Sequence, residues 1–384
     1  MEFTANRKEL KTALEKVSSA CRKSNIAVTT CTKLTLSNSV LMLTGYDLET
    51  GITTSIPVEE PSSMIDGSTG GEILVECAKF SEIISKQTND EVSITVDDAT
   101  SIMTIKSGRS KCRIGVLKAD DYPAIPQFES GNSITIKADI LADMIRQTIF
   151  AVSTNENRPV LTGECFTVEN NKLEVAAIDG FRLAVRTENV TTDYSGKFVV
   201  KADALRSLLR LLKSDAEINV IPCRKHVIFD FGETKLFSRL LEGDFHNYKG
   251  SIPTGNSTTV TVNVKSVSEA LERFSLLTSD KAKAPLICDF HDDGIYMSLK
   301  SSLGEMQDVI SDADVNGNNV RIGFTCKFLL EALKATETDK VKLFLNGSAS
   351  PMTIKPMDGD AFTLLVLPLR LKDYQEVKQW YSIK

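Results

Sequence analysis

The chain has 384 residues, of which 42% are hydrophobic and 25% charged, and its formal net charge is -6. This length suits two or three domains with separate cores, and no apolar stretch approaches the ~18 residues that a membrane span needs. The negative charge argues against bulk attraction to nucleic acid, but it does not say where the positive residues lie. The charged opening, MEFTANRKEL, has no apolar signal core, so we expect a cytoplasmic protein without membrane contact.

The first predicted element is a short strand that continues as an amphipathic helix, and it occurs three times. The copies align without gaps and start at Phe3, Ile134 and Val260. Apolar residues recur at helical spacing in each copy, as in the first at Leu10, Leu14, Val17 and Cys21. A repeat of this kind predicts tandem copies of one structural plan.

A second element also recurs, as a helix of about ten residues, a polar turn and an alternating strand. It occupies 78–96, 202–220 and 326–344. Short strands with Gly, Asn or Asp turns fill the intervening sequence, as at 33–47, 93–108 and 172–187. An acidic turn with an aromatic residue and a proline ends the first two copies, at 116–126 and 240–253.

These elements predict an α+β fold with three tandem domains, each with two helices and antiparallel sheet. The predicted domains are 1–127, 128–253 and 254–371, and a carboxyl-terminal extension covers 372–384.

Signatures of catalysis and metal binding are missing from the sequence. It contains no GxxxxGK[ST], HExxH or GxSxG motif, and its eight cysteines form no CxxC pair. The stretch 312–323 starts like a calcium loop but has Gly323 where a bidentate Glu is required, which favours a turn. We therefore expect no catalytic residues, no metal and no cofactor.

Four motifs connect the repeat to a known family: RPVLTG at 158–163, IDGFRLAV at 178–185, SGRS at 107–110 and LPLRL at 367–371. With the three tandem domains, they resemble the bacterial DNA polymerase III beta subunit, the sliding clamp, over residues 1–371. The resemblance implies a head-to-tail homodimeric ring that encircles double-stranded DNA of any sequence. Its implied partners are the polymerase alpha subunit, an ATP-driven clamp loader and other proteins with clamp-binding motifs.

Basic residues on the predicted helices fit a DNA-facing bore, because a sliding ring needs phosphate contacts without base recognition. Our candidate DNA-binding residues are Arg22, Lys23, Lys79, Asn155, Arg206 and Arg210. The alternative is that these residues form ordinary solvated faces. Basic residues recur on the predicted helices of all three repeats, in the third at Lys327 and Lys334, and this recurrence favours the bore.

A cleft for partner peptides is implied by matching the family's motifs. It comprises Arg158, Leu161, Ile178, Gly180, Phe181, Arg182, Leu183, His246, Ala349, Pro351, Leu365, Val366, Leu367, Pro368, Leu369, Arg370 and Leu371. Such a site would accept a short motif with Leu and Phe, with Arg158 and Arg182 at its polar end. The alternative for the final motif is an edge strand that ends the last sheet. Phe181 departs from the family's frequent His, and His246 departs from its pattern at the domain junction.

The subunit interface is also implied by the resemblance. Basic and apolar residues of the first domain would face acidic and apolar residues of the partner's third domain. The assigned residues are Arg109, Lys111, Cys112, Ile114, Arg273, Leu276, Leu277, Glu305 and Asp308. The segment GEMQD has fewer acids than the family's usual patch, which would weaken the dimer or make it more sensitive to salt.

Two functional alternatives remain at this stage. One is a clamp-like interaction platform that does not encircle DNA, and the other is an enzyme without a recognised signature. The extension at 372–384 is either a mobile end or short helix, or a segment that masks the peptide cleft.

Overall fold

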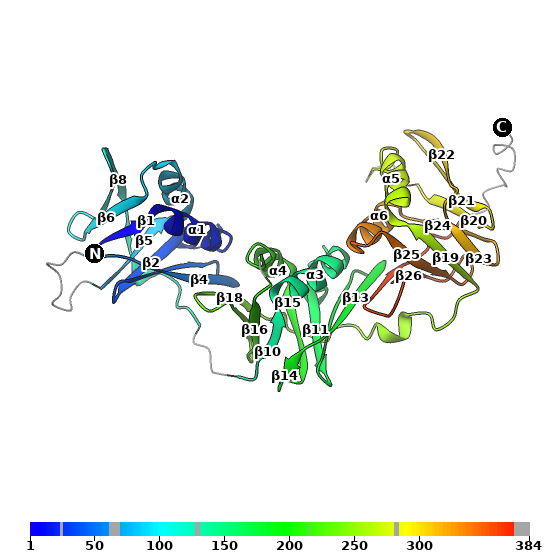
Figure 1. Cartoon of the computed structure of the whole chain (residues 1–384), viewed down its shortest axis with the longest axis horizontal. Helices are drawn as coiled ribbons and strands as arrows, with labels where there is room; N and C mark the ends of the chain where they lie inside the picture. The colour runs from blue at the N-terminus through cyan, green and yellow to red at the C-terminus, as the bar shows by residue number, and fades with distance from the viewer. Residues whose placement is uncertain (24–25, 61–69, 127–130, 214, 280–283, 372–384) are drawn as a thin grey trace. The chain divides into compact units, whose positions relative to one another are not determined.

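The computed structural model describes residues 1–23, 26–60, 70–126, 131–213, 215–279 and 284–371. It divides into two compact units. Unit 1 comprises Met1–Ala142 and Val190–Leu240, and unit 2 comprises Asp143–Asn189 and Leu241–Lys384. Both combine helices with antiparallel sheets, as predicted (Figure 1). Within the described ranges, no helix is long and apolar enough to span a bilayer.

Unit 1 contains a four-stranded sheet in the order β1-β6-β7-β8. These strands are β1 (Glu2–Asn6), β6 (Glu91–Asp97), β7 (Ile102–Ser107) and β8 (Ser110–Gly115). Two helices, α1 (Arg7–Ser18) and α2 (Cys77–Lys86), pack against each other in the same unit. Strand β8 pairs only with β7, so one of its edges is open within the described structure.

The second sheet of unit 1 has ten strands in the order β14-β10-β16-β17-β18-β4-β3-β2-β5-β9. Its early strands are β2 (Cys31–Ser37), β3 (Val40–Tyr46), β4 (Thr50–Pro57), β5 (Gly71–Glu76) and β9 (Leu117–Lys118). Its later strands are β10 (Ile134–Lys137), β14 (Thr191–Thr192), β16 (Glu217–Pro222), β17 (His226–Asp230) and β18 (Thr234–Arg239). Unit 1 also includes β15 (Gly196–Lys201) and α4 (Ala202–Leu209), while α3 (Ala138–Thr148) begins there and ends in unit 2.

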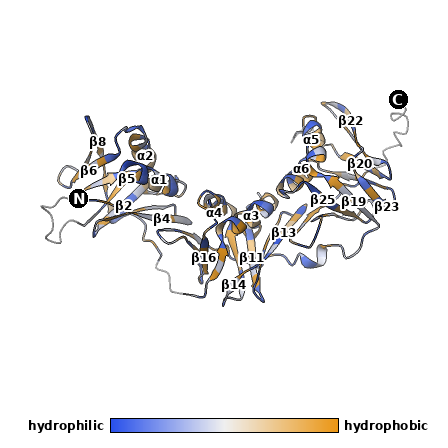
Figure 2. Ribbon diagram, viewed as in Figure 1, coloured by the Kyte–Doolittle hydropathy of each residue, from blue (hydrophilic) through white to orange (hydrophobic). Residues whose placement is uncertain are grey.

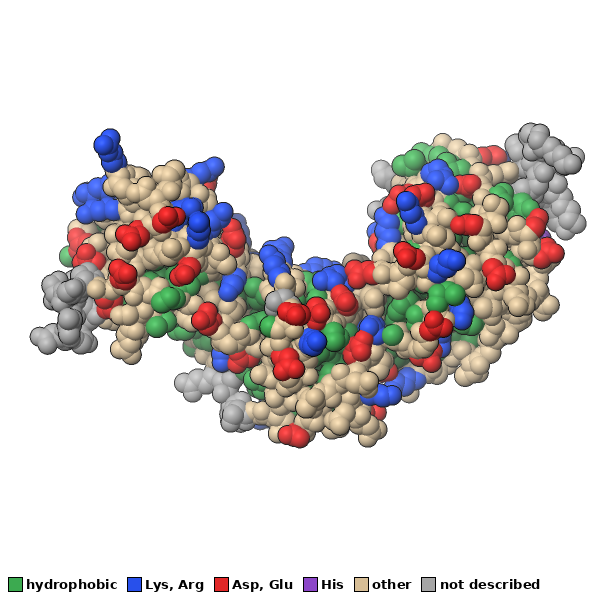
Figure 3. Space-filling view, viewed as in Figure 1, with side chains coloured by type: hydrophobic (Ala, Val, Ile, Leu, Met, Phe, Trp, Pro, Cys, Tyr) green, Lys and Arg blue, Asp and Glu red, His purple; other side chains and the backbone are tan. Residues whose placement is uncertain are grey.

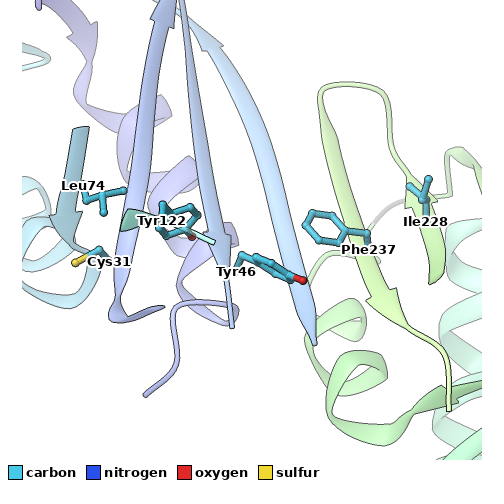
Figure 4. Close-up of a cluster of buried hydrophobic side chains, with 6 residues drawn as sticks. All are labelled: Cys31, Tyr46, Leu74, Tyr122, Ile228 and Phe237. Atoms are coloured by element: carbon cyan, nitrogen blue, oxygen red, sulfur yellow. The ribbon is translucent and has the colours of Figure 1, made fainter. Parts of the chain in front are cut away.

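The pairing of β4 with β18 joins the first repeat to the second, and it depends on a glycine. Gly51 pairs with Phe237, and a Cβ atom at Gly51 would lie 2.0 Å from the Phe237 ring. Phe237 is buried, and its ring centroid lies 5.3 Å from that of Tyr46 (Figure 4). Tyr122, from the acidic turn of the first repeat, belongs to the same buried cluster. The turn residues at the repeat boundary thus hold this junction together.

We expect Gly51→Val to destabilise unit 1 by about 1–3 kcal/mol or more, because Phe237 would have to leave its rotamer or the strands would have to separate. Chemical denaturation of the full chain would measure this loss. Gly115→Ala in β8 is the control, since an added Cβ there has no neighbour within 4 Å. An unchanged unfolding midpoint for Gly51→Val would show that the ring moves without cost.

Unit 2 contains a sheet whose strands follow the order β11-β12-β13-β27-β26-β25-β19-β23. These are β11 (Gly163–Glu169), β12 (Lys172–Ile178), β13 (Arg182–Asn189), β27 (Phe362–Val366), β26 (Met352–Pro356), β25 (Lys340–Leu345), β19 (Thr258–Asn263) and β23 (Asp314–Gly317). A four-stranded sheet has the order β22-β21-β20-β24, with β20 (Leu286–His291), β21 (Gly294–Ser301), β22 (Gly304–Ile310) and β24 (Val320–Phe324). Helices α5 (Val264–Ser275) and α6 (Cys326–Ala335) pack together.

The helices form where the repeat predicts them, and two begin with the same cap. The side chain of Asn6 accepts hydrogen bonds from the N–H groups of Lys8 and Glu9, and Asn263 does the same for Lys265 and Ser266. Such caps satisfy N–H groups that have no partner within the helix. The apolar faces of α1 and α5 are buried, and Figure 2 shows hydrophobic residues concentrated within the helices and sheets.

Two expectations about local structure are corrected. Helix α1 ends at Ser18, so Cys21 lies beyond it; the N–H groups of Ala20 and Cys21 bond carbonyls three residues back and tighten the helix end. The stretch 312–323, expected as a turn, contains β23 and most of β24, because Asp314–Gly317 pairs with β19. Short 3₁₀ turns complete the structure at Ala27–Thr30, Ala119–Asp121, Ile149–Ala151, Pro159–Thr162 and Lys249–Ser251.

Candidate partner-binding, DNA-facing and subunit interfaces

The last strand, β27, lies inside its sheet and not at an edge, because it pairs with β13 on one side and β26 on the other. The chain then leaves the sheet. The N–H of Leu367 donates to the carbonyl of Phe181 (2.9 Å), and the N–H of Leu369 donates to the carbonyl of Gly323 on β24 (2.8 Å). The motif LPLRL therefore connects the two sheets of unit 2, and the edge-strand alternative is wrong.

Three apolar side chains on or next to this connection face solvent. Phe181 is 59% exposed, Leu367 39% and Leu369 37%. We call these three residues the carboxyl-terminal surface. Large exposed apolar side chains that lie together are typical of sites for protein partners. Within the motif, Arg370 is also exposed, and Pro368 and Leu371 are half-buried.

Arg182 is buried next to Phe181, and its guanidinium is already bonded to two carboxylates. Its Nε donates to Asp179 Oδ2 (3.0 Å), and its Nη1 forms an ion pair with Glu331 on α6. The guanidinium also lies against two aromatic rings, 5.3 Å from the centroid of Phe150 and 4.6 Å from that of Phe328. Arg182 is only 8% exposed, and both of these carboxylates and both rings belong to the same unit.

These contacts extend to the exposed Phe181. Its ring stacks on that of Phe328, with centroids 5.9 Å apart and planes at 30°. Phe328 therefore contacts Arg182 and Phe181 together, and the ion pair beneath the surface is linked by one ring to the aromatic side chain on it. Gly180 has a φ of +92°, a left-handed conformation that glycine adopts at little cost, at the turn that presents Phe181.

Two loops of unit 2 carry other predicted cleft residues. The N–H of Arg158 donates to the carbonyl of Asn155, and the N–H of Leu161 donates to the carbonyl of Arg158. Arg158 is exposed and Leu161 is half-buried. Asn155, predicted to bind DNA, lies in this same exposed loop, and its side chain accepts from the N–H of Asn157.

The second loop holds the exposed His246 between two buried aromatic residues. Tyr248 donates a hydrogen bond to Glu174 on β12 (2.6 Å), and its ring packs edge-on against Phe245. Burial raises the pKa of Tyr248, and the bond to Glu174 raises it further, so its hydroxyl stays protonated and keeps the loop attached.

The remaining predicted cleft residues fall into two groups. Leu183, Leu365 and Val366 are buried in the sheet, at no more than 2% exposure. Gly180 and Ala349 are exposed, and Ile178 and Pro351 are half-buried. The extension at 372–384 lies outside the described residues.

In unit 1, the predicted DNA-facing residues Lys23, Lys79, Arg206 and Arg210 are exposed. Lys and Arg side chains are visible near α1 and α4 in Figure 3. Arg22 is half-buried, and it donates to the carbonyl of Ser19 and to the hydroxyl of Ser207 on α4. The segment after α1 is therefore attached to the second repeat through an arginine.

The residues predicted for the subunit interface lie at two open sheet edges, one in each unit. In unit 1, Arg109 and Lys111 are exposed on or next to β8, with Cys112 and Ile114 half-buried. In unit 2, β22 is one edge strand of its four-stranded sheet, and α5 packs beside it. Arg273 on α5 pairs with Asp308 on β22, and Glu305 pairs with Lys300.

Besides these charged residues, the edge of unit 2 carries several apolar side chains that are exposed to solvent. Leu276 is 75% exposed, Leu303 56% and Val309 42%, and Leu277 is half-buried. Leu303 and Val309 were missed by the sequence reasoning. Their signal was the alternation in LGEMQDVI, which places Val309 on the outward face of an edge strand.

Three family models together match nearly the whole chain. They are the N-terminal domain of the DNA polymerase III beta subunit at residues 1–126, its central domain at 135–247 and its C-terminal domain at 249–370. The chain is 30% identical to a beta sliding clamp of Bacillus subtilis over 377 residues, covering 96% of this chain and 100% of that protein.

Solved structures show the same likeness. A DNA polymerase sliding clamp from Bacillus subtilis matches with a TM-score of 0.90 and 30% identity, over 97% of this chain and 100% of that one. A putative DNA polymerase III beta subunit from Eubacterium rectale matches with a TM-score of 0.88 and 29% identity, over 96% and 99% of the two chains.

Proposed function

Because the chain belongs to the family of bacterial DNA polymerase III beta subunits, the sliding clamps, we propose that two copies of it close head to tail into a ring around duplex DNA. Its function is that of a processivity clamp, a non-catalytic subunit in DNA replication. The observation that carries the proposal is the tandem match of all three clamp domains across residues 1–370. We place its action in the cytoplasm.

The two open edges support closure of the ring. Strand β8 in unit 1 is basic, and β22 in unit 2 is acidic and flanked by exposed apolar residues. Pairing β8 of one subunit with β22 of the other would remove both open edges and bring opposite charges together. A head-to-tail dimer makes this contact twice.

The ring would hold its partners by topology and proximity. Phosphate contacts from residues such as Lys79 and Arg210 carry no base information, so the ring can slide on any sequence. The carboxyl-terminal surface would bind a short apolar motif of the polymerase alpha subunit, of the clamp loader or of other replication and repair proteins. Tethering of this kind raises the effective concentration of an enzyme at its template.

Loading on DNA tests the proposal directly. The protein is loaded by a clamp loader onto a nicked circular plasmid, isolated, and the circle is then cut once. A ring that encircles DNA stays on the circle and slides off the linear product. Retention on linear DNA, or no loading, would favour an interaction platform that does not encircle DNA.

We expect Leu369→Ala to weaken binding of a polymerase-derived clamp-binding peptide by an amount on the order of 1–3 kcal/mol, because it removes apolar contact area from the carboxyl-terminal surface. Isothermal titration calorimetry with the peptide measures the change. Leu369 is 37% exposed, so the unfolding midpoint should change little.

Leu48→Ala is a matched control for this variant. Leu48 is also a leucine at 37% exposure, but it lies in unit 1, in the turn between β3 and β4, and is not part of the carboxyl-terminal surface. Leu183→Ala is unsuitable, since Leu183 is a buried core residue whose truncation would destabilise the sheet. Equal peptide affinities for wild type, Leu369→Ala and Leu48→Ala would place the peptide elsewhere.

A further inference from the structure

Asp203, in the first turn of α4, stands between two arginines that are candidates for DNA contact. Its Oδ1 lies 3.0 Å from Arg206 Nη1, and its Oδ2 lies 4.0 Å from Arg22 Nη1. All three side chains are between 41% and 54% exposed. One carboxylate is therefore shared by two guanidinium groups at a solvent-facing site within unit 1.

Arg22 is held in place by hydrogen bonds that do not involve the Asp203 carboxylate. Its Nε donates to the carbonyl of Ser19 (2.7 Å), and its Nη2 donates to Ser207 Oγ (2.9 Å). The hydroxyl of Ser207 is fixed in turn, since it donates to the carbonyl of Asp203 (3.1 Å) and the residue is 1% exposed. These bonds leave Nη1 of Arg22 as the group that faces the carboxylate.

The arrangement sets up a competition between carboxylate and phosphate. A phosphate that approaches Arg22 and Arg206 meets two positive charges and one negative charge, so the site presents a net charge of about +1 instead of +2. The Asp203 side chain is exposed and can move aside, whereas Arg22 is already oriented. Guanidinium groups bind carboxylates and phosphates with the same hydrogen-bond geometry, so either anion fits.

We propose that Asp203 weakens the contact of this site with the DNA backbone: its carboxylate pairs with Arg22 and Arg206 and yields to phosphate only in part. This inference rests on the proposed function, since it assumes that α4 faces DNA. Weak phosphate contacts suit a ring that must slide, because a contact that holds too strongly slows movement along the duplex.

The alternative role for Asp203 is structural. An acidic residue in the first turn of a helix stabilises it through the helix dipole. Asp139, in the first turn of α3, also lies in unit 1: its carboxylate accepts a hydrogen bond from the N–H of Ile140 (2.7 Å) and pairs with no arginine in the described part of the chain. Asp139 is therefore the matched control, because its amide variant removes the same charge from the same kind of position.

The test compares Asp203→Asn, Asp203→Glu and Asp139→Asn in the full chain. Affinity for a fluorescent 30-base-pair duplex, a length of about three helical turns, is measured by anisotropy over a range of salt concentrations. Asp203→Asn should bind up to roughly tenfold more tightly near 0.1 M salt, and its log–log salt slope should steepen by about 0.9 for one additional phosphate contact. Asp203→Glu should keep the wild-type slope.

Each other result overturns the inference. Equal salt slopes for Asp203→Asn and Asp139→Asn would mean that DNA affinity depends only on the net charge of the protein. Weaker DNA binding by Asp203→Asn would mean that the carboxylate orients the arginines for DNA. Adding Arg206→Gln to Asp203→Asn should remove most of the gain. The plasmid experiment separates the two proposals: if wild type loads and slides off normally while the slopes are equal, only the role of Asp203 fails.

Discussion

Leu276→Asp is expected to convert the proposed dimeric ring to monomers, so that the mass in solution falls from about twice 42.2 kDa to 42.2 kDa. Leu276 follows α5 beside the edge strand β22 and is 75% exposed, the largest exposed fraction among the exposed large apolar side chains described. Burial of a leucine contributes about 1.5–3 kcal/mol, and an unpaired carboxylate in the same place adds a desolvation cost. A head-to-tail dimer suffers this loss at both contacts.

Apolar contact should dominate at this edge because the acidic side chains are already engaged within their own subunit. Asp308 pairs with Arg273, and Glu305 pairs with Lys300. The basic residues of a partner's β8 would have to compete with these bonds, and exposed ion pairs contribute little in any case. We therefore expect raised salt to weaken the dimer far less than Leu276→Asp does.

Analytical ultracentrifugation over a range of protein concentrations measures the dimer, and Leu48→Asp is the control. Leu48 is an exposed leucine in unit 1 that lies on neither edge strand. The monomeric variant should also fail to remain on circular DNA, while its affinity for the polymerase peptide stays at the wild-type value. A stable dimer of Leu276→Asp would show that the subunit interface does not include the end of α5.

The helices and strands of this fold could be predicted from the sequence, because the same spacing of apolar residues occurs in three copies. Leu10, Leu14 and Val17 lie on the buried face of α1 as expected, and Asn6 and Asn263 occupy equivalent positions in the first and third copies. Pairing between repeats was not predicted. Whether β4 meets β18 depends on a glycine and a phenylalanine 186 residues apart, Gly51 and Phe237, and no local pattern reports that.

The same limit applies to the candidate sites. The motifs assigned Phe181 and Leu367 to one cleft, and a backbone hydrogen bond joins these two residues in the structure. The motifs gave no sign that Arg182 is buried in an ion pair, because its partner Glu331 is 149 residues away. Buried and exposed positions alternate along a strand, so a motif that enters a site contributes core residues such as Leu183 as well as surface residues. The domain boundaries at 127, 253 and 371 stay predictions.

Arg182→Met is expected to destabilise unit 2 by about 3–5 kcal/mol, the usual cost of removing one partner from a buried ion pair. Methionine keeps most of the side-chain length but leaves the carboxylates of Asp179 and Glu331 without their cation. Asp179 is 12% exposed and Glu331 34%, so water can compensate Glu331 better, which favours the lower end of the range. The contact of the guanidinium with two aromatic rings is lost as well.

Chemical denaturation monitors this loss, and a double-mutant cycle with Glu331→Gln assigns it to the pair. The double variant should be more stable than the sum of the two single effects predicts, because the unpaired charge on Glu331 is removed. Arg182→Lys should recover only part of the stability, since an ammonium group cannot bond both carboxylates in the planar geometry of a guanidinium.

Measurements of peptide binding distinguish two roles for Arg182: a residue that supports the surface from within, and a residue that contacts the bound peptide. If Arg182 acts through Phe328 on Phe181, then Arg182→Met loses stability and peptide affinity together, whereas Leu369→Ala loses affinity alone. If instead Arg182 frames the polar end of the peptide, Arg182→Met should keep its unfolding midpoint and still lose affinity, most of all for peptides with an acidic residue. The exposed Arg158 would then share that role, and Arg158→Met would show the same preference. We expect the first result, because Arg182 is 8% exposed and its guanidinium is already bonded to two carboxylates.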